Sequence, residues 1–166
     1  MKKSILWVED QALSDLQELA APVIMDANYD LEVACSATEA ERLIRDKAYQ
    51  VVVVDIRIPP GLDPRWSRLY RESGEDKIQA RLGLHLLRAL LIEGSQEREI
   101  FSGWPAWVEA GRFGILTVET EYELRPDLGN IKVAYAQKKA GAGADILIRV
   151  IEQVLAKPVH TDRKDE

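Results

Sequence analysis

Thiol and imidazole side chains are scarce in this sequence. Its 166 residues include one cysteine, Cys35, and two histidines, His85 and His160. A single thiol cannot close an internal disulfide, and these three side chains are too few for an ordinary zinc site built from cysteine and histidine. The sequence therefore argues against a disulfide-stapled scaffold, and a reducing compartment, the cytoplasm, is the expected location.

Long apolar runs and an excess of basic charge are also lacking. No apolar stretch approaches the ~20 residues that span a bilayer. The two N-terminal lysines are followed too soon by Glu9 and Asp10 for a secretory signal. Lys and Arg number 22 against 28 Asp and Glu, a net charge of -6. Because an acidic surface repels phosphate backbones, we expect neither nucleic acid nor membrane as a partner.

The chain does have the composition of one soluble domain, with 46% hydrophobic and 30% charged residues. Short apolar runs alternate with segments of helical periodicity. Strands are predicted at 4–8, 31–35, 51–54, 113–118 and 131–136. Strands that alternate with helices at this spacing indicate a parallel sheet. We therefore predict an α/β fold, a five-stranded parallel sheet of flavodoxin-like order with helices on both faces.

Acidic residues follow two of the predicted strands. Glu9 and Asp10 come after the first strand, and Asp55 comes directly after four valines in the third. Ligands of open parallel sheets bind beyond the carboxyl ends of the strands, where these side chains would meet if the strands are neighbours. Like charges this close raise one another's pKa. Mg²⁺ would relieve the repulsion and keep coordination positions for phosphate oxygens, so we predict a site for Mg²⁺ and a phosphoryl group.

The chemistry of such a site needs a nucleophile and groups that hold the phosphoryl oxygens. A carboxylate can be the nucleophile and form an aspartyl-phosphate. Phosphoryl transfer otherwise depends on positioning and charge neutralisation. Thr117, near the end of the fourth strand, could hydrogen-bond a phosphoryl oxygen, with Thr120 as an alternative. Lys138 or Lys139, after the fifth strand, could pair with these oxygens.

Together these motifs resemble the receiver domain of two-component response regulators, the CheY-like family. The segment Ile5–Asp10 resembles the family's opening strand with its acidic pair, and Val53–Pro59 resembles the phosphoacceptor strand with proline four residues after the aspartate. The match is nearly gapless over 1–61 and resumes over about 113–156. The resemblance implies a receiver domain over 1–156, followed by a polar tail at 157–166.

The resemblance also implies roles for individual residues. It implies Asp55 as the phosphoacceptor, and Glu9, Asp10 and Asp55 as ligands of Mg²⁺, with the backbone carbonyl of Arg57 as a further ligand. It implies a sensor histidine kinase or a phosphotransfer protein as the phosphodonor. Because no DNA-binding domain follows in this sequence, we expect a stand-alone signalling protein, not an enzyme. Its output would be contact with a downstream protein or formation of a homodimer.

Departures from the family pattern leave alternatives open. Extra residues fall in about 62–82 and 95–112, and neither candidate lysine is followed by proline. The spacing from Thr117 favours Lys139, whereas Tyr135, three residues earlier, favours Lys138. The helix over 119–130 is expected to be short. These departures motivate an alternative, a receiver-like interaction module that acts through its insertions without phosphorylation. A phosphohydrolase is disfavoured because Arg57 stands where a second catalytic acid would be.

The insertions carry aromatic and basic side chains whose roles the sequence leaves open. Arg65, Arg68 and Arg71 recur at helical spacing, and a solvated, mobile segment is favoured over an anion site. Phe101, Trp104 and Trp107 are expected either to form a partner patch or to cover one edge of the sheet. We predict a surface or packed position on a helix for His85.

Overall fold

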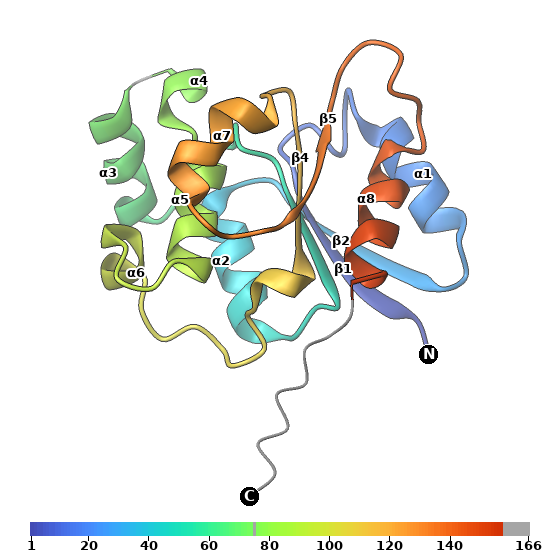
Figure 1. The fold of residues 1–166 in the computed structure, drawn as a ribbon, viewed down its shortest axis with the longest axis horizontal. Coiled ribbons are helices and arrows are strands. Elements are labelled where there is room, and N and C mark those ends of the chain that lie inside the picture. Colours follow the sequence, from blue (N-terminus) through green and yellow to red (C-terminus); the bar gives the residue numbers. More distant parts are fainter. Residues whose placement is uncertain (75, 158–166) are drawn as a thin grey trace, which may run out of the picture.

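The computed structural model describes residues 1–74 and 76–157, and its centre is a parallel sheet of five strands. The strand order is β2-β1-β3-β4-β5 (Figure 1). The strands are β1 (Lys3–Val8), β2 (Tyr29–Ala34), β3 (Val51–Val54), β4 (Phe113–Thr117) and β5 (Ala134–Gln137). This is the flavodoxin-like order, so the predicted architecture is confirmed.

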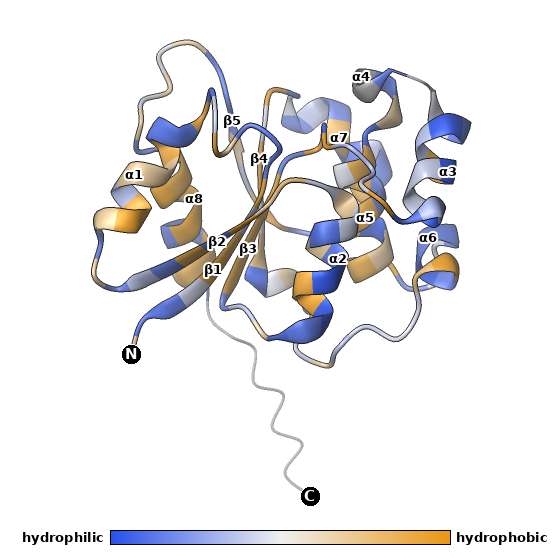
Figure 2. Ribbon diagram, turned by 180° about the vertical axis from the view of Figure 1, so that it is seen from behind, coloured by the Kyte–Doolittle hydropathy of each residue, from blue (hydrophilic) through white to orange (hydrophobic). Residues whose placement is uncertain are grey.

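Helices cover both faces of the sheet (Figure 1). On one face lie α1 (Gln17–Met25) and α8 (Ile146–Leu155), and on the other lie α2 (Ala37–Asp46), α5 (Leu82–Leu91) and α7 (Glu121–Leu128). Successive residues of a strand point to opposite faces. Leu6 and Val8 accordingly belong to one core cluster, while Ile5 and Trp7 belong to the other. Figure 2 shows the resulting hydrophobic central strands between the two helical layers.

The first insertion builds an outer helical layer beyond α2 and α5 (Figure 1). It contains α3 (Pro64–Ser73) and α4 (Lys77–Ala80), and α6 (Gln96–Ile100) lies beside α3. Trp66 of α3 is fully buried and stacks on Phe101, with ring centroids 3.8 Å apart. Arg65, Arg68 and Arg71 are exposed, as a solvated face predicts, but the segment is not solvated throughout, because Trp66 anchors α3 to the core.

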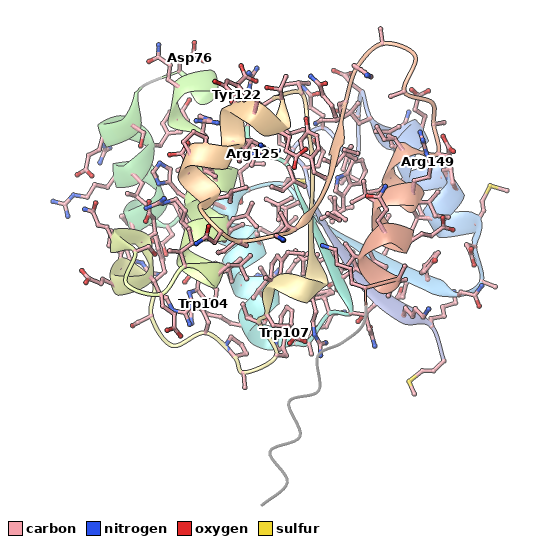
Figure 3. The ribbon with its side chains drawn as sticks, viewed as in Figure 1. Asp76, Trp104, Trp107, Tyr122, Arg125 and Arg149 are labelled. Atoms are coloured by element: carbon pink, nitrogen blue, oxygen red, sulfur yellow. The ribbon has the colours of Figure 1, made fainter. Side chains whose placement is uncertain are left out.

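The second insertion covers the edge of the core near α2. Trp104 and Trp107 are half-buried against the core cluster, and both lie on the loop that leads to β4 (Figure 3). The rings of Trp107 and Phe113 are nearly parallel, with centroids 6.5 Å apart. The guanidinium of Arg45 lies 4.1 Å from the centre of the Trp104 ring. Of the two interpretations of these aromatic residues, the structure supports the covering flap.

Some element boundaries differ from the sequence expectations. The fifth strand is Ala134–Gln137 rather than 131–136, because pairing with β4 begins at Ala134, opposite Gly114. Helix α7 is short, as expected, and Gly129 at its C-terminal end has a positive φ of 58°. Residues 158–166 of the predicted polar tail lie outside the described residues. No helix in the described part of the chain has the length and apolar character that crossing a bilayer requires.

Candidate functional site

Backbone pairing brings the acidic residues together at the carboxyl edge of the sheet. Val8 pairs with Val54, and the amide of Asp55 donates a hydrogen bond to the Val8 carbonyl at 2.9 Å. Glu9 and Asp55 therefore follow directly on neighbouring strands. Carboxylate oxygens of Glu9, Asp10 and Asp55 all lie within 4.8 Å of one another. The convergence expected from the sequence is present.

Lys138 is the lysine that enters this carboxylate cluster. Its backbone amide donates to the Thr117 carbonyl at 2.7 Å, which fixes the start of the loop after β5 against the end of β4. Its Nζ lies 2.5 Å from Glu9 Oε2 and 3.3 Å from Asp55 Oδ2. Lys139 is exposed and has no contact with the cluster among the described residues. The backbone register therefore decides between the two lysines that the sequence left open, and it favours Lys138.

The cluster is buried and carries excess negative charge. Glu9 is 1% exposed and Asp55 is 4% exposed. Burial and the charge of Asp55 raise the pKa of Glu9 to about 7, although the ammonium group of Lys138 acts in the opposite direction. Among the described residues, Asp55 Oδ1 is buried without a hydrogen-bond partner. Leaving a buried acceptor unsatisfied is costly, so the site has a polar atom available for a ligand.

The donor set fits a hard divalent cation. Three carboxylates supply oxygen atoms only, which is the ligand type that Mg²⁺ prefers. The unsatisfied Asp55 Oδ1 and the raised pKa of Glu9 both indicate a site that a cation would stabilise. Arg57 lies two residues beyond Asp55 in a bend of the loop after β3, as the sequence places it. The ligand role of its carbonyl remains a prediction.

The two candidate threonines differ in their surroundings. Thr117 is the last residue of β4 and is fully buried, and its Oγ1 accepts a long hydrogen bond of 3.5 Å from the Glu119 amide. Thr120 is the N-cap of α7: its Oγ1 accepts from the Glu123 amide, while the Glu123 carboxylate accepts from the Thr120 amide. This capping box occupies Thr120. Thr117 is therefore the better candidate for contact with a ligand at the sheet edge.

Glu119 and Arg81 adjoin the site and were not among the residues predicted from the sequence. Glu119 is buried, and its Oε1 lies 2.9 Å from Arg81 Nε. Burial raises the pKa of Glu119, whereas Arg81 opposes this effect. The hydroxyl of Tyr135 donates to the Glu119 carbonyl at 2.6 Å. The sequence could have suggested Glu119 as a site neighbour, because it stands two residues after Thr117. It gave no such indication for Arg81, which lies in an insertion.

Comparisons with known proteins bear on the fold. No protein-family model matches the sequence, and no curated protein is significantly similar to it. Solved structures do match. A CheY-like response regulator receiver domain from Methanospirillum hungatei is 18% identical with a TM-score of 0.52, and the match covers 93% of this chain and 94% of that one. The non-phosphorylated HemR receiver domain from Leptospira biflexa is 22% identical with a TM-score of 0.53, covering 95% and 97%.

A third match is the signal receiver domain of a LuxO repressor protein from Vibrio parahaemolyticus. It is 16% identical, its TM-score is 0.55, and the match covers 93% of this chain and 91% of that one. At these identities the likeness concerns the arrangement of the backbone. It extends over nearly the whole described chain and agrees with the strand order found here. This chain therefore has the fold of the CheY-like receiver domains of response regulators.

Proposed function

We propose that this chain is a signalling switch controlled by phosphorylation of Asp55. The observation that carries the proposal is the position of Asp55 in a group with the carboxylates of Glu9 and Asp10. Lys138 Nζ lies 3.3 Å from Asp55 Oδ2, and Asp55 Oδ1 has no hydrogen-bond partner among the described residues. This is the arrangement that an aspartyl-phosphate requires, namely a nucleophilic carboxylate, a cation site and a lysine. The receiver-domain fold supports the same interpretation.

Each site residue has a proposed part in the reaction. An oxygen of Asp55 bonds to phosphorus as the bond between phosphorus and the donor breaks, and the donor group leaves with a proton from solvent. Glu9 and Asp10, with Asp55 and the Arg57 carbonyl, would hold Mg²⁺, which when bound neutralises charge on the carboxylates and the phosphoryl oxygens. Lys138 would pair with a phosphoryl oxygen, and Thr117 would donate a hydrogen bond to another.

The phosphodonor and the output are proposed by class. A sensor histidine kinase or a phosphotransfer protein would donate the phosphoryl group. The product would act through contact with a downstream protein or a second copy of the chain. The added charge at Asp55 lies next to the loop between β4 and α7, so a change in this loop would transmit the modification to the surface. In this proposal the chain is a signalling module of the cytoplasm rather than an enzyme.

Intact-mass spectrometry tests the proposal directly. The full chain is incubated with acetyl phosphate and Mg²⁺, and its mass is followed over time. We expect one added phosphoryl group in the wild type and none in Asp55→Asn, while Asp30→Asn, at an exposed position of β2, behaves as the wild type. Omitting Mg²⁺ should abolish the increment. A folded wild type that never gains the increment would contradict the proposal and favour the phosphorylation-independent interaction module.

A further inference from the structure

A chain of hydrogen bonds links three polar side chains where α3 and α6 meet α5. The Oγ of Ser73, the last residue of α3, lies 3.0 Å from Nε2 of His85 on α5. Nδ1 of the same ring lies 2.8 Å from Oε1 of Glu97 on α6. Nε of Arg88 lies 3.1 Å from that carboxylate oxygen. A hydroxyl, an imidazole and a carboxylate from three helices are thus arranged in series.

The carboxylate determines which ring nitrogen of His85 carries the proton. Burial acts to raise the pKa of Glu97, but hydrogen bonds from its own backbone and from His85, with the charge of Arg88, outweigh this effect and lower the pKa. An ionised carboxylate only accepts hydrogen bonds, so Nδ1 of His85 is the donor. With the proton on Nδ1, Nε2 of an uncharged ring is the acceptor that faces the Ser73 hydroxyl. In this tautomer the imidazole can accept the proton of the serine.

The carboxylate is the most buried of these three side chains. Glu97 is buried, the His85 side chain is 23% exposed, and Ser73 is partly exposed at the end of its helix. The next residue, Gly74, has a φ of 131°, a conformation that side chains rarely adopt, so the chain turns away from the helix directly after Ser73. The carboxylate that orients the ring is therefore shielded, whereas Ser73 keeps part of its surface exposed. This order of nucleophile, base and orienting group is that of activated serines.

We propose that Ser73 is an activated nucleophile that accepts an acyl group from esters or thioesters, with His85 as general base and Glu97 as the positioning residue. The Ser73 oxygen bonds to the acyl carbon as the bond from that carbon to the leaving oxygen or sulfur breaks. The hydroxyl proton passes to His85 Nε2 and from there to the leaving group, which departs as an alcohol or thiol. The acyl group remains on Ser73 as an ester.

The proposed activation is of the size that one positioned base provides, about 10²–10⁴-fold. A fluorophosphonate tests it, because the serine oxygen bonds to phosphorus, fluoride leaves, and the hydroxyl proton is taken by His85. The full chain is treated with the probe, and labelling is followed by intact mass and peptide mapping. We expect labelling at Ser73 about 100-fold faster than at any other serine. Ser67→Ala, a change on the same helix, should leave the rate unchanged.

Substitutions within the series separate activation from a structural role. Ser73→Ala should abolish rapid labelling without loss of thermal stability, because the position is partly exposed. His85→Gln should slow labelling about 100-fold. Glu97→Gln should slow it about tenfold or more, and Glu97→Asp should restore part of the rate. Labelling that is slow, spread over several serines and unchanged in Ser73→Ala would overturn the proposal and leave the three residues as a structural tie between helices.

Discussion

Lys138 places a positive charge between two buried carboxylates. Its Nζ contacts Glu9 at 2.5 Å and Asp55 at 3.3 Å, so a cation that binds these carboxylates competes with the ammonium group. We expect Lys138→Met to strengthen Mg²⁺ binding by about 1.5 kcal/mol, or about tenfold in Kd, the size of a hydrogen bond to a charged group. The same change should slow phosphorylation of Asp55, because it removes the contact that we propose between Lys138 and the phosphoryl group.

Isothermal titration calorimetry with Mg²⁺ measures the first effect, and intact mass measures the second. Lys139→Met is the matched control, since it removes the same charge from the neighbouring, exposed position. It should leave both quantities unchanged. Equal effects of the two substitutions would show that the net charge of the chain, rather than the position of Lys138 Nζ, determines the affinity for Mg²⁺.

Glu97 makes stability depend on pH in the acidic range. Its pKa in the folded chain lies below its usual value of 4.5, since burial is outweighed by hydrogen bonds and by Arg88. The folded state therefore gains stability from ionised Glu97 above about pH 4.5 and loses it as the pH falls through the lower, folded pKa. The free energy of unfolding of the wild type, measured with urea, should fall as the pH drops below about 4.5. In Glu97→Gln the free energy of unfolding should depend less steeply on pH. In the control Glu99→Gln, at an exposed position of the same helix, the dependence should match that of the wild type.

At the scale of elements, the start of α5 is fitted closely against the end of β3. The amide of Gly83 donates to the Ile56 carbonyl at 2.9 Å, and a Cβ at Gly83 would lie 1.9 Å from the Asp55 carbonyl oxygen. Backbone must move to admit even one methyl group. We expect Gly83→Ala to lower the free energy of unfolding by about 1–3 kcal/mol or more. It should also lower the phosphorylation rate, because Asp55 is displaced.

Chemical denaturation and the acetyl phosphate assay measure these two effects. Gly111→Ala is a suitable control, since a Cβ there meets nothing within 4 Å. A Gly83→Ala chain with wild-type stability and rate would mean that α5 shifts away from the sheet at little cost. The close contact would then have no part in positioning the site.

Regular elements were predictable from the sequence where local pattern and tertiary packing agree. Four successive valines fit a strand buried on both faces, and β3 follows them. Apolar Ile131 and Val133 also suggested strand, yet β5 starts after both, because its pairing with β4 begins at Ala134. Local pattern cannot specify which residues find a partner strand.

The same distinction applies to the site. Carboxylates at strand ends were predictable because the parallel arrangement fixes where those ends meet. The two spacing arguments disagreed about the lysine: the distance from Thr117 favoured Lys139 and Tyr135 favoured Lys138. Only the folded chain decides for Lys138, whose amide donates to the Thr117 carbonyl. The pair Arg81 and Glu119 joins residues from an insertion and from the loop after β4, so only the folded chain brings it together.

At the scale of the whole molecule, Glu41 connects the inserted layer to the core. This buried carboxylate of α2 accepts a hydrogen bond from Trp66 Nε1 at 2.8 Å and lies 3.2 Å from Arg65 Nη2, both on α3. It also pairs with Arg45 of its own helix at 3.0 Å. A buried charge held by groups from both layers is costly to expose or to leave unpaired. The insertion and the sheet core should therefore unfold as one cooperative unit.

Two substitutions at Trp66 test whether the inserted layer and the core unfold together. Trp66→Ala removes the ring that stacks on Phe101 and should lower the free energy of unfolding by about 3–5 kcal/mol, the usual cost of deleting a buried aromatic side chain. Trp66→Phe keeps an aromatic ring but leaves the Glu41 oxygen without its donor, so a loss of about 1–3 kcal/mol is expected.

Urea unfolding followed by circular dichroism and by tryptophan fluorescence should give coincident transitions for the wild type and both variants, because a single cooperative unit has one midpoint for every probe. Separate transitions, with the phosphorylation of Asp55 kept after the first, would instead mean that the inserted layer is an independent appendage. Coincident transitions and a phosphorylation rate that falls with Trp66→Ala would mean that the helices added between β3 and β4 are part of the framework that holds the sheet edge in place.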